Sequence, residues 1–253
     1  MNHLSVALII FVCVFCSALL GLYLRTLLPE HHLDDDSIGV VKLATGLIAT
    51  MAALVLGLLI SSAKSSFDTV NASVTHDAAN VILLDRILAR YGPQTQEIRG
   101  MLKQIVTVAV QQVASGEPAQ LARLHSPEAL ERAEYLQRKI EELSPLNDTQ
   151  RRLQARAIDL TDNALAVREL GLLQASGSTP AALLITLVFW LCIIFGTFGL
   201  FTHANATVTV ALFLGALCTS IAIFLILELN TPLDGLVTVS LSPMREALGM
   251  LGH

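Results

Sequence analysis

Four long stretches without any charged residue constrain this chain more than any other feature of its sequence. Each is longer than 20 residues, and they are Leu4–Leu24, Leu43–Ala63, Ala181–Phe201 and Ala206–Leu227. About 20 helical residues span the hydrocarbon core of a bilayer, and a buried helix of a soluble domain is seldom apolar on all sides for so long. The sequence therefore predicts an all-α membrane protein with four transmembrane helices.

The composition agrees with this class and excludes several others. Charged residues make up 15% of the chain, against about 25% in an average soluble domain. A formal net charge of -5 without a basic cluster excludes a typical nucleic-acid binder. Four cysteines cannot form a disulfide framework at this length, and the apolar excess excludes a disordered chain.

The first uncharged stretch has a second interpretation, a cleaved signal peptide. Its start, Met1-Asn2-His3, contains no Lys or Arg, and the apolar run is longer than a usual signal-peptide core. Cys13 and Cys16 also lack the small preceding residue of a lipoprotein cleavage site. We therefore expect the stretch to remain as a membrane anchor.

The distribution of Lys and Arg predicts the orientation of the spans. An even number of spans leaves both termini on one side, together with residues 64–180, which carry 13 of the 16 Lys and Arg residues. The link at residues 28–41 carries none. Under the positive-inside rule, both termini and residues 64–180 are cytoplasmic.

Residues 64–180 show the apolar spacing of a helical bundle. Apolar residues recur every three or four positions from Phe67 to Tyr91, in a stripe nearly continuous with the second span. Gly92-Pro93 ends that stripe, because Gly suits a helix C-terminus and Pro cannot continue a helix. Three more helices are predicted: 94–113, a helix capped by Ser126 that runs to about 143, and a helix that starts at Asn147 or Asp148 and ends before Gly177.

The chain is thus expected to consist of four parts. They are a first transmembrane helix pair at 1–63, a cytosolic helical region at 64–180, a second pair at 181–229, and a turn with a short amphipathic segment at 230–253. In the last part, Ser242-Pro243 is predicted to cap a piece, Met244–Leu251, that lies on the membrane interface. Val237-Thr238-Val239 is the only strand candidate.

A stripe of small, hydroxyl-bearing and basic residues follows the second span at helical spacing. Its members are Lys42, Gly46, Thr50, Ala53, Gly57, Ser61 and Lys64. In a symmetric ring of such helices, the stripe would line a narrow pore with positive mouths, which favours anions. The alternative is close helix packing through contacts between small residues. The spacing alone leaves both open.

Two further polar features are candidates for function. The residues His31, His32, Asp34, Asp35 and Asp36 could bind a divalent cation or titrate near neutral pH. They could equally form a solvated link in which Asp36 or Ser37 caps the second span.

Glu228 ends the fourth span at the level predicted for Lys64. An ion pair between the two would lower the cost of placing either near hydrocarbon. Glu228 could also be a boundary charge among hydrated headgroups.

Signals for catalysis are poor. The sequence contains no phosphate-binding Gly loop, nucleophile elbow or His-Glu-x-x-His motif, so we expect neither an enzyme nor a cofactor. Ionisable residues, which transport mechanisms usually need inside the membrane, are confined to the ends of the spans.

Segments spread over nearly the whole chain share the sequence of a known family. They are Asp36–Lys42, Thr45–Thr50, Val55–Ile60, Ala63–Asp68, Asn80–Pro93, Asn147–Arg151, Phe189–Phe201 and Leu227–Leu236. Together they resemble the bacterial bestrophin-like family of unknown function. The turn Pro232-Leu233-Asp234-Gly235 also looks like the Asp-Pro-Phe-Gly turn that true bestrophins have after their fourth span.

The resemblance to bestrophins implies an architecture and a function. Bestrophins are pentameric, ligand-gated anion channels with cation-selective bacterial relatives, cytosolic termini and a pore lined by the second helix. The resemblance thus implies a homo-oligomer in the bacterial inner membrane that passes small inorganic ions. This chain lacks the Ile-Pro…Phe neck pattern in its second span and an acidic calcium clasp after the fourth, so those sites are not transferred.

The leading hypothesis is an oligomeric channel for small inorganic anions. The first rival is a membrane-anchored signalling or scaffold protein whose cytosolic helices bind a partner. The second is a transporter or an enzyme.

Overall fold

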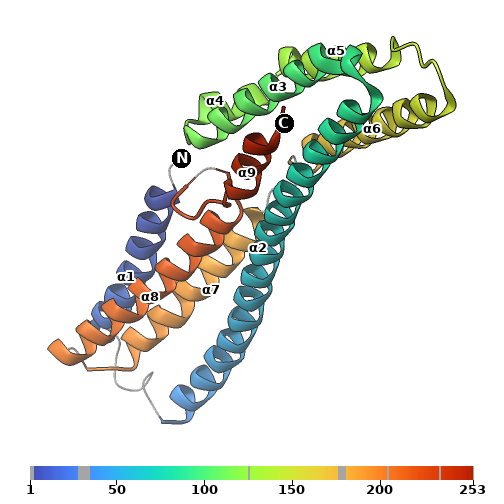
Figure 1. The fold of residues 1–253 in the computed structure, drawn as a ribbon. Coiled ribbons are helices and arrows are strands. Elements are labelled where there is room, and N and C mark those ends of the chain that lie inside the picture. Colours follow the sequence, from blue (N-terminus) through green and yellow to red (C-terminus); the bar gives the residue numbers. More distant parts are fainter. Residues whose placement is uncertain are drawn as a thin grey trace. The chain divides into compact units, whose positions relative to one another are not determined.

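The computed structural model describes residues 3–27, 35–124, 126–175, 181–203, 205–233 and 235–252, and all regular structure within them is helical (Figure 1). The elements are α1 (His3–Leu27), α2 (Asp35–Tyr91), the 3-10 helix η2 (Pro93–Thr95), α3 (Gln96–Ala114), α4 (Pro118–Leu124), α5 (Pro127–Glu141), α6 (Asp148–Ala175), α7 (Ala181–Leu200), α8 (Ala206–Leu229) and α9 (Ser242–Met250). The predicted all-α class is confirmed.

The strand candidate is not a strand. Val237-Thr238-Val239 belongs to an irregular segment after α8, in which the Val239 N–H donates to the Pro232 carbonyl over 2.9 Å. A single bond of this kind closes a turn and does not build a ladder.

Among the described residues, four helices are long and apolar enough to cross a membrane: α1, α2, α7 and α8. They contain the four uncharged stretches, as predicted. The second stretch and the stripe that follows it form one helix of 57 residues. At 1.5 Å per residue, α2 is about 85 Å long, nearly three times the thickness of a hydrocarbon core.

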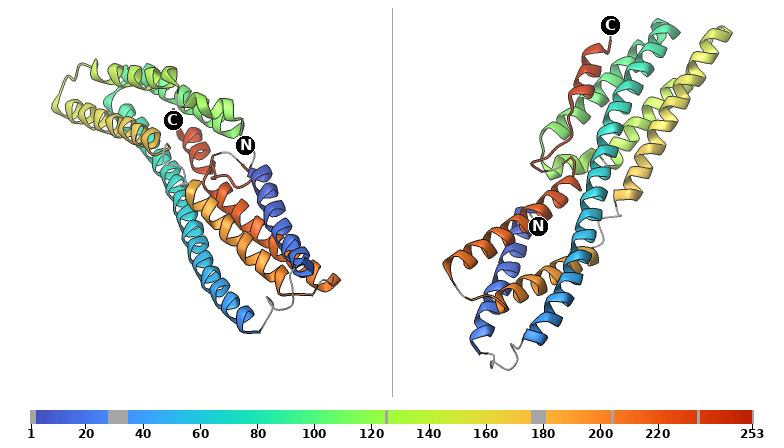
Figure 2. Two further views of the ribbon diagram at one scale, coloured as in Figure 1. Left: turned by 180° about the vertical axis from the view of Figure 1, so that it is seen from behind. Right: turned by 90° about the horizontal axis from the view of Figure 1, so that it is seen from below.

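The chain forms two compact units. Unit 1 comprises Met1–Ser66 and Ser178–Asn230, and unit 2 comprises Phe67–Gly177 and Thr231–His253. In unit 1, α1 packs along α7 and α8, and the three helices lie side by side (Figure 1, Figure 2). Arg25 Nη2 and His203 Nε2 are 3.1 Å apart, so the end of α1 lies beside the turn between α7 and α8.

Glycine makes the approach of α1 to α7 possible. A Cβ atom at Gly199 would clash with the Ala18 carbonyl oxygen, and one at Gly21 would clash with the Gly196 carbonyl oxygen. Small residues let two membrane helices approach backbone to backbone, which increases dispersion contacts where water supplies no hydrophobic driving force. Ser220 adds a hydrogen bond to the Ala7 carbonyl, 2.6 Å long, between α8 and α1.

In unit 2, the chain turns back at the end of α2. Gly92 adopts φ 138°, a conformation that side chains disfavour, and Pro93 opens η2. The buried Thr95 hydroxyl bonds to the carbonyls of Leu88 and Gly92 at 2.6 and 2.8 Å. These bonds satisfy carbonyls that the end of α2 leaves without helical partners.

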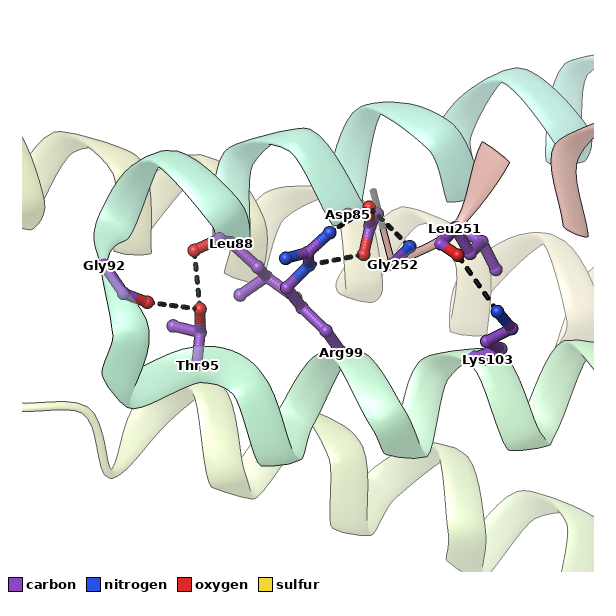
Figure 3. Close-up of polar contacts among 8 residues, drawn as sticks. All are labelled: Asp85, Leu88, Gly92, Thr95, Arg99, Lys103, Leu251 and Gly252. Atoms are coloured by element: carbon purple, nitrogen blue, oxygen red, sulfur yellow. Dashed lines mark hydrogen bonds and ion pairs between the residues drawn. The ribbon is translucent and has the colours of Figure 1, made fainter. Parts of the chain in front are cut away.

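A buried ion pair joins the two arms of this hairpin (Figure 3). Arg99 Nε and Nη2 donate to the two carboxylate oxygens of Asp85 at 2.7 and 2.9 Å. The bidentate bond raises the pKa of Arg99 above its ordinary value. Asp85 also accepts a longer bond, 3.5 Å, from the Gly252 N–H.

The segment at α9 packs on the same hairpin. Ala247 and Leu251 are buried, α9 contacts α3, and Lys103 Nζ donates to the Leu251 carbonyl over 3.1 Å. The apolar side of this piece is therefore used inside unit 2, whereas we expected it on the membrane interface. Ser242 is the first residue of α9 and not its cap, because Leu241 occupies the N-cap position.

Side-chain caps mark the starts of α5 and α6 in unit 2. Ser126 accepts from the Ala129 N–H at 3.3 Å and Asn147 from the Gln150 N–H at 2.9 Å, which confirms both as N-caps. The segment between α3 and α5 contains a short helix, α4, that the sequence analysis did not predict. Pro118 suits its first position, where an N–H has no helical acceptor.

Substituting Gly199 by Ala is expected to destabilise unit 1. The added methyl group overpacks the contact with α1, at a cost of about 1–3 kcal/mol. A lower Tm of the purified protein in detergent, followed by circular dichroism, measures this. Gly39→Ala is the control, since nothing lies within 4 Å of a Cβ atom there. Equal losses of Tm for both variants would contradict the packing described.

Replacing Asp85 by Ala is expected to cost about 3–5 kcal/mol of unfolding free energy, because it leaves a largely buried guanidinium without its partner. The side chains of Asp85 and Arg99 are only 5% and 18% exposed. Arg151→Ala breaks the Asp148–Arg151 pair, whose side chains are 81% and 71% exposed, and should cost at most about 1 kcal/mol. Similar denaturation curves for the two variants would refute the importance of the buried pair.

Candidate functional site

The half of α2 that belongs to unit 1 has three distinct faces. One face is packed: Thr45, Ala52, Leu59 and Ala63 are buried, and the last three join the core formed with α1, α7 and α8. A second face carries large apolar residues that are exposed, among them Leu43, Leu47, Leu54 and Leu58. The third face is the stripe that the sequence analysis proposed as a pore lining.

All seven residues of that stripe are exposed within one chain. They are Lys42, Gly46, Thr50, Ala53, Gly57, Ser61 and Lys64. The structure brings them together along one side of α2, about a quarter to a third of a turn away from the packed face. The stripe therefore takes no part in close helix packing inside unit 1, and its predicted role as a pore lining stays a prediction.

The two glycines of the stripe support this separation. Nothing lies within 4 Å of a Cβ atom built at Gly46 or Gly57, in contrast to Gly199, where an added Cβ clashes. Close packing through small residues thus occurs between α1 and α7, and in the described part of the chain it does not occur at the α2 glycines.

The hydroxyl of Thr50, near the centre of the stripe, is hydrogen-bonded to the backbone of its own helix. Thr50 Oγ1 donates to the Leu47 carbonyl over 2.7 Å. Its oxygen therefore presents lone pairs to the exposed side, and the hydroxyl has to rotate before it can donate to an anion. Lys42 and Lys64 place a basic group at each end of this face.

Glu228 has a partner that the sequence analysis did not name. The carboxylate is buried at the end of α8, and its Oε1 lies 3.1 Å from Nδ1 of His3 at the start of α1. The two residues are 225 positions apart, so no local pattern could pair them. The ion pair predicted between Glu228 and Lys64 stays a prediction.

Only part of the candidate metal cluster belongs to the described residues. His31, His32 and Asp34 lie outside the described residues, while Asp35 and Asp36 form the first residues of α2. Asp36 is therefore inside the helix and not at its cap. Among the described residues, no group of three His, Cys, Asp or Glu side chains is arranged to hold a metal ion.

Comparison with known proteins gives one family and one similar structure. A family model described as a bestrophin-like domain matches residues 11–244. No curated protein matches the chain. A crystal structure of a bacterial bestrophin homologue from Klebsiella pneumoniae, carrying a point mutation, has a similar fold, with a TM-score of 0.56 over 97% of this chain and 99% of that chain.

The structural match supports a conclusion about the fold, and the family match supports a conclusion about the family. The sequences of this chain and the Klebsiella homologue are 18% identical, so that comparison shows a common fold and nothing finer. The family match covers most of the chain, including α2 and the turn after α8, and it confirms the resemblance seen in the sequence. The chain therefore belongs to the bestrophin-like family.

Proposed function

We propose that this protein is a homo-oligomeric membrane channel that conducts small inorganic anions along a path lined by α2. The observation that carries the proposal is the stripe from Lys42 to Lys64, which one chain leaves exposed along its whole length. Membership of the bestrophin-like family, whose known members are channels, supports it.

The bilayer supplies the physical reason for a ring. A single chain in lipid would leave the small and hydroxyl-bearing side chains of the stripe against hydrocarbon, where small side chains make few contacts and hydroxyls can bond only to the backbone. If several copies turn this face inward, the same groups line water and the exposed leucines of α2 are left for lipid or for neighbouring helices. A pentamer is the number suggested by analogy with bestrophins.

The spacing of the two lysines fits the two mouths of such a pore. Lys42 and Lys64 are 22 positions apart in one helix, which corresponds to about 33 Å. A hydrocarbon core is about 30 Å thick, so both ammonium groups fall at the membrane surfaces. Rings of positive charge at the mouths raise the local anion concentration and disfavour cations.

The topology follows from the distribution of basic residues. Both termini and the helical region 64–180 are placed in the cytoplasm, with the helix pairs 1–63 and 181–229 in the bacterial inner membrane. The partners of the protein are then the lipid bilayer, further copies of itself and small inorganic ions, with no nucleic acid. The scaffold alternative is less favoured, since the known bestrophins are channels and not enzymes or adaptors.

Reversing the charge at one mouth is expected to change ion selectivity. Lys64→Glu should lower the ratio of anion to cation permeability, measured from reversal potentials of purified protein in planar bilayers under a salt gradient. Lys139→Glu is the control, because this lysine lies on α5 in unit 2. Unchanged selectivity of Lys64→Glu would refute its role, and a protein that forms oligomers but passes no current would refute the channel.

Cysteine accessibility is expected to separate the two exposed faces of α2. In a background with the four native cysteines replaced by Ala, Thr50→Cys should react with a charged, membrane-impermeant thiosulfonate reagent, and Leu54→Cys should not. The reason is that the stripe faces water in the proposed ring while Leu54 faces lipid or protein. Equal reaction at both positions, or reaction at Leu54 alone, would place the path elsewhere.

A further inference from the structure

A buried carboxylate of unit 1 lies outside the stripe proposed as the ion path. Glu228 belongs to the last turn of α8, and only 5% of its side chain is exposed. Its Oε1 lies 3.1 Å from Nδ1 of His3 at the start of α1, whose side chain is 26% exposed. An ionised carboxylate in such a place is costly unless a positive group compensates it. The imidazole of His3 supplies that charge when it is protonated, and its exposure lets it exchange protons with water.

Both members of this pair occupy the helix end that disfavours their charge. The macrodipole of a helix is positive at its N-terminus, where His3 lies in α1, and negative at its C-terminus, where Glu228 lies in α8. Neither charge is therefore stabilised by its own helix. The contact between α1 and α8 brings the two charges together and offsets a cost that neither helix offsets by itself.

The pair contains the histidine of unit 1 that faces Glu228. The other charged residues and histidines that the structure describes in this unit are Arg25, Asp35, Asp36, Lys42, Lys64 and His203. Arg25 and His203 are 3.1 Å apart at the far end of α1, and α7 contains no charged residue. Lys64 is predicted at the level of Glu228 and adds a positive charge there. Histidine is the side chain whose ordinary titration falls between about pH 5 and 8, so His3 is the group that makes this end of unit 1 sensitive to pH.

A second polar contact joins α1 to α8. Ser220 of α8 donates to the Ala7 carbonyl of α1 over 2.6 Å, and Ala7 is one helical turn beyond His3. A serine hydroxyl has no titration in the neutral range, so this bond stays when the imidazole loses its proton. Deprotonation of His3 therefore loosens the first turn of α1 and the last turn of α8, while the rest of their contact stays closed.

The end of α8 shares a buried core with α2. Ile223 and Ile226 of α8 are fully buried in the cluster that also contains Leu59 and Ala63 from the packed face of α2. The helix end that His3 holds is thus part of the support of the helix that carries the stripe. Because packed cores switch between discrete arrangements and do not deform continuously, a change at the pair reaches α2 through this core.

We propose that His3 and Glu228 form a pH-sensitive clamp, which fastens α1 to α8 while His3 is protonated and loosens when it is not. While both groups are charged, the imidazolium compensates the buried carboxylate, and this stabilisation is lost as pH rises through the titration of the imidazole. The proposed topology places both residues on the cytoplasmic side, so the clamp responds to cytosolic pH. Its effect on ion flow rests on the proposed channel, whereas the clamp itself does not.

The dependence of Tm on pH, measured on the full-length protein in detergent, tests the clamp. From about pH 6 to about pH 8.5, the Tm of the unaltered protein is expected to fall by about 2–4 °C more than that of His3→Lys, which keeps a positive charge over this range. Glu228→Gln keeps a hydrogen-bonding group without the charge, and should remove the same excess fall. His203→Gln is the matched control, because this histidine lies beside Arg25 at the other end of α1 and its loss should leave the excess fall intact.

The same pH dependence of Tm in the unaltered protein and in His3→Lys would overturn the clamp, as would an excess fall that His203→Gln abolishes. Currents in planar bilayers at the two pH values test the effect on ion flow. They should decrease towards the higher pH in the unaltered protein, because α2 loses part of its support, and stay constant in His3→Lys. Equal changes of current in both proteins would overturn the regulation. A protein that passes no current at either pH would refute the proposed channel, and the Tm profile would still decide the clamp.

Discussion

The α2 helix carries the constraint on which the rest of this structure depends. Within lipid, every backbone polar group must be bonded inside its own segment, so the uncharged run at 43–63 has to be helical. The helix does not end where that run ends, and continues to Tyr91 as one element. In its first half, α2 carries apolar residues on most sides. In its second half, the apolar residues form a single stripe that packs in unit 2.

The glycines of unit 1 differ in how closely they are packed, and the difference bears on function. Glycine allows α1 and α7 to approach closely, while the glycines of the α2 stripe contact nothing in the described chain. A residue type that looks the same in the sequence is therefore used for a dry contact in one helix and left open in another. Only the open set is available to neighbouring copies or to water.

Unit 2 is organised by a few polar groups at the ends of its helices. Gln150 joins the start of α6 to the last carbonyl of α2, and Gln154 donates to the Ile140, Glu141 and Leu143 carbonyls at the end of α5. Each of these bonds satisfies carbonyls that a helix end leaves without intrahelical partners. The Asn147–Arg151 segment, which is part of the family resemblance, thus has a structural reason for its composition.

The sequence by itself determined the helical class, the four apolar helices and most helix ends, because hydrophobic runs, caps and Gly-Pro breaks act over a few residues. Ser126, Asn147 and Gly92 are such local signals, whereas the helix at Pro118–Leu124 had too weak a signal to be predicted. Only the tertiary structure decided that Asp85 meets Arg99, that Glu228 meets His3, and that the α2 stripe is exposed while Ala52 and Leu59 are buried. Those outcomes depend on how distant helices approach one another, and the spacing of residues within one helix carries no information about its neighbour.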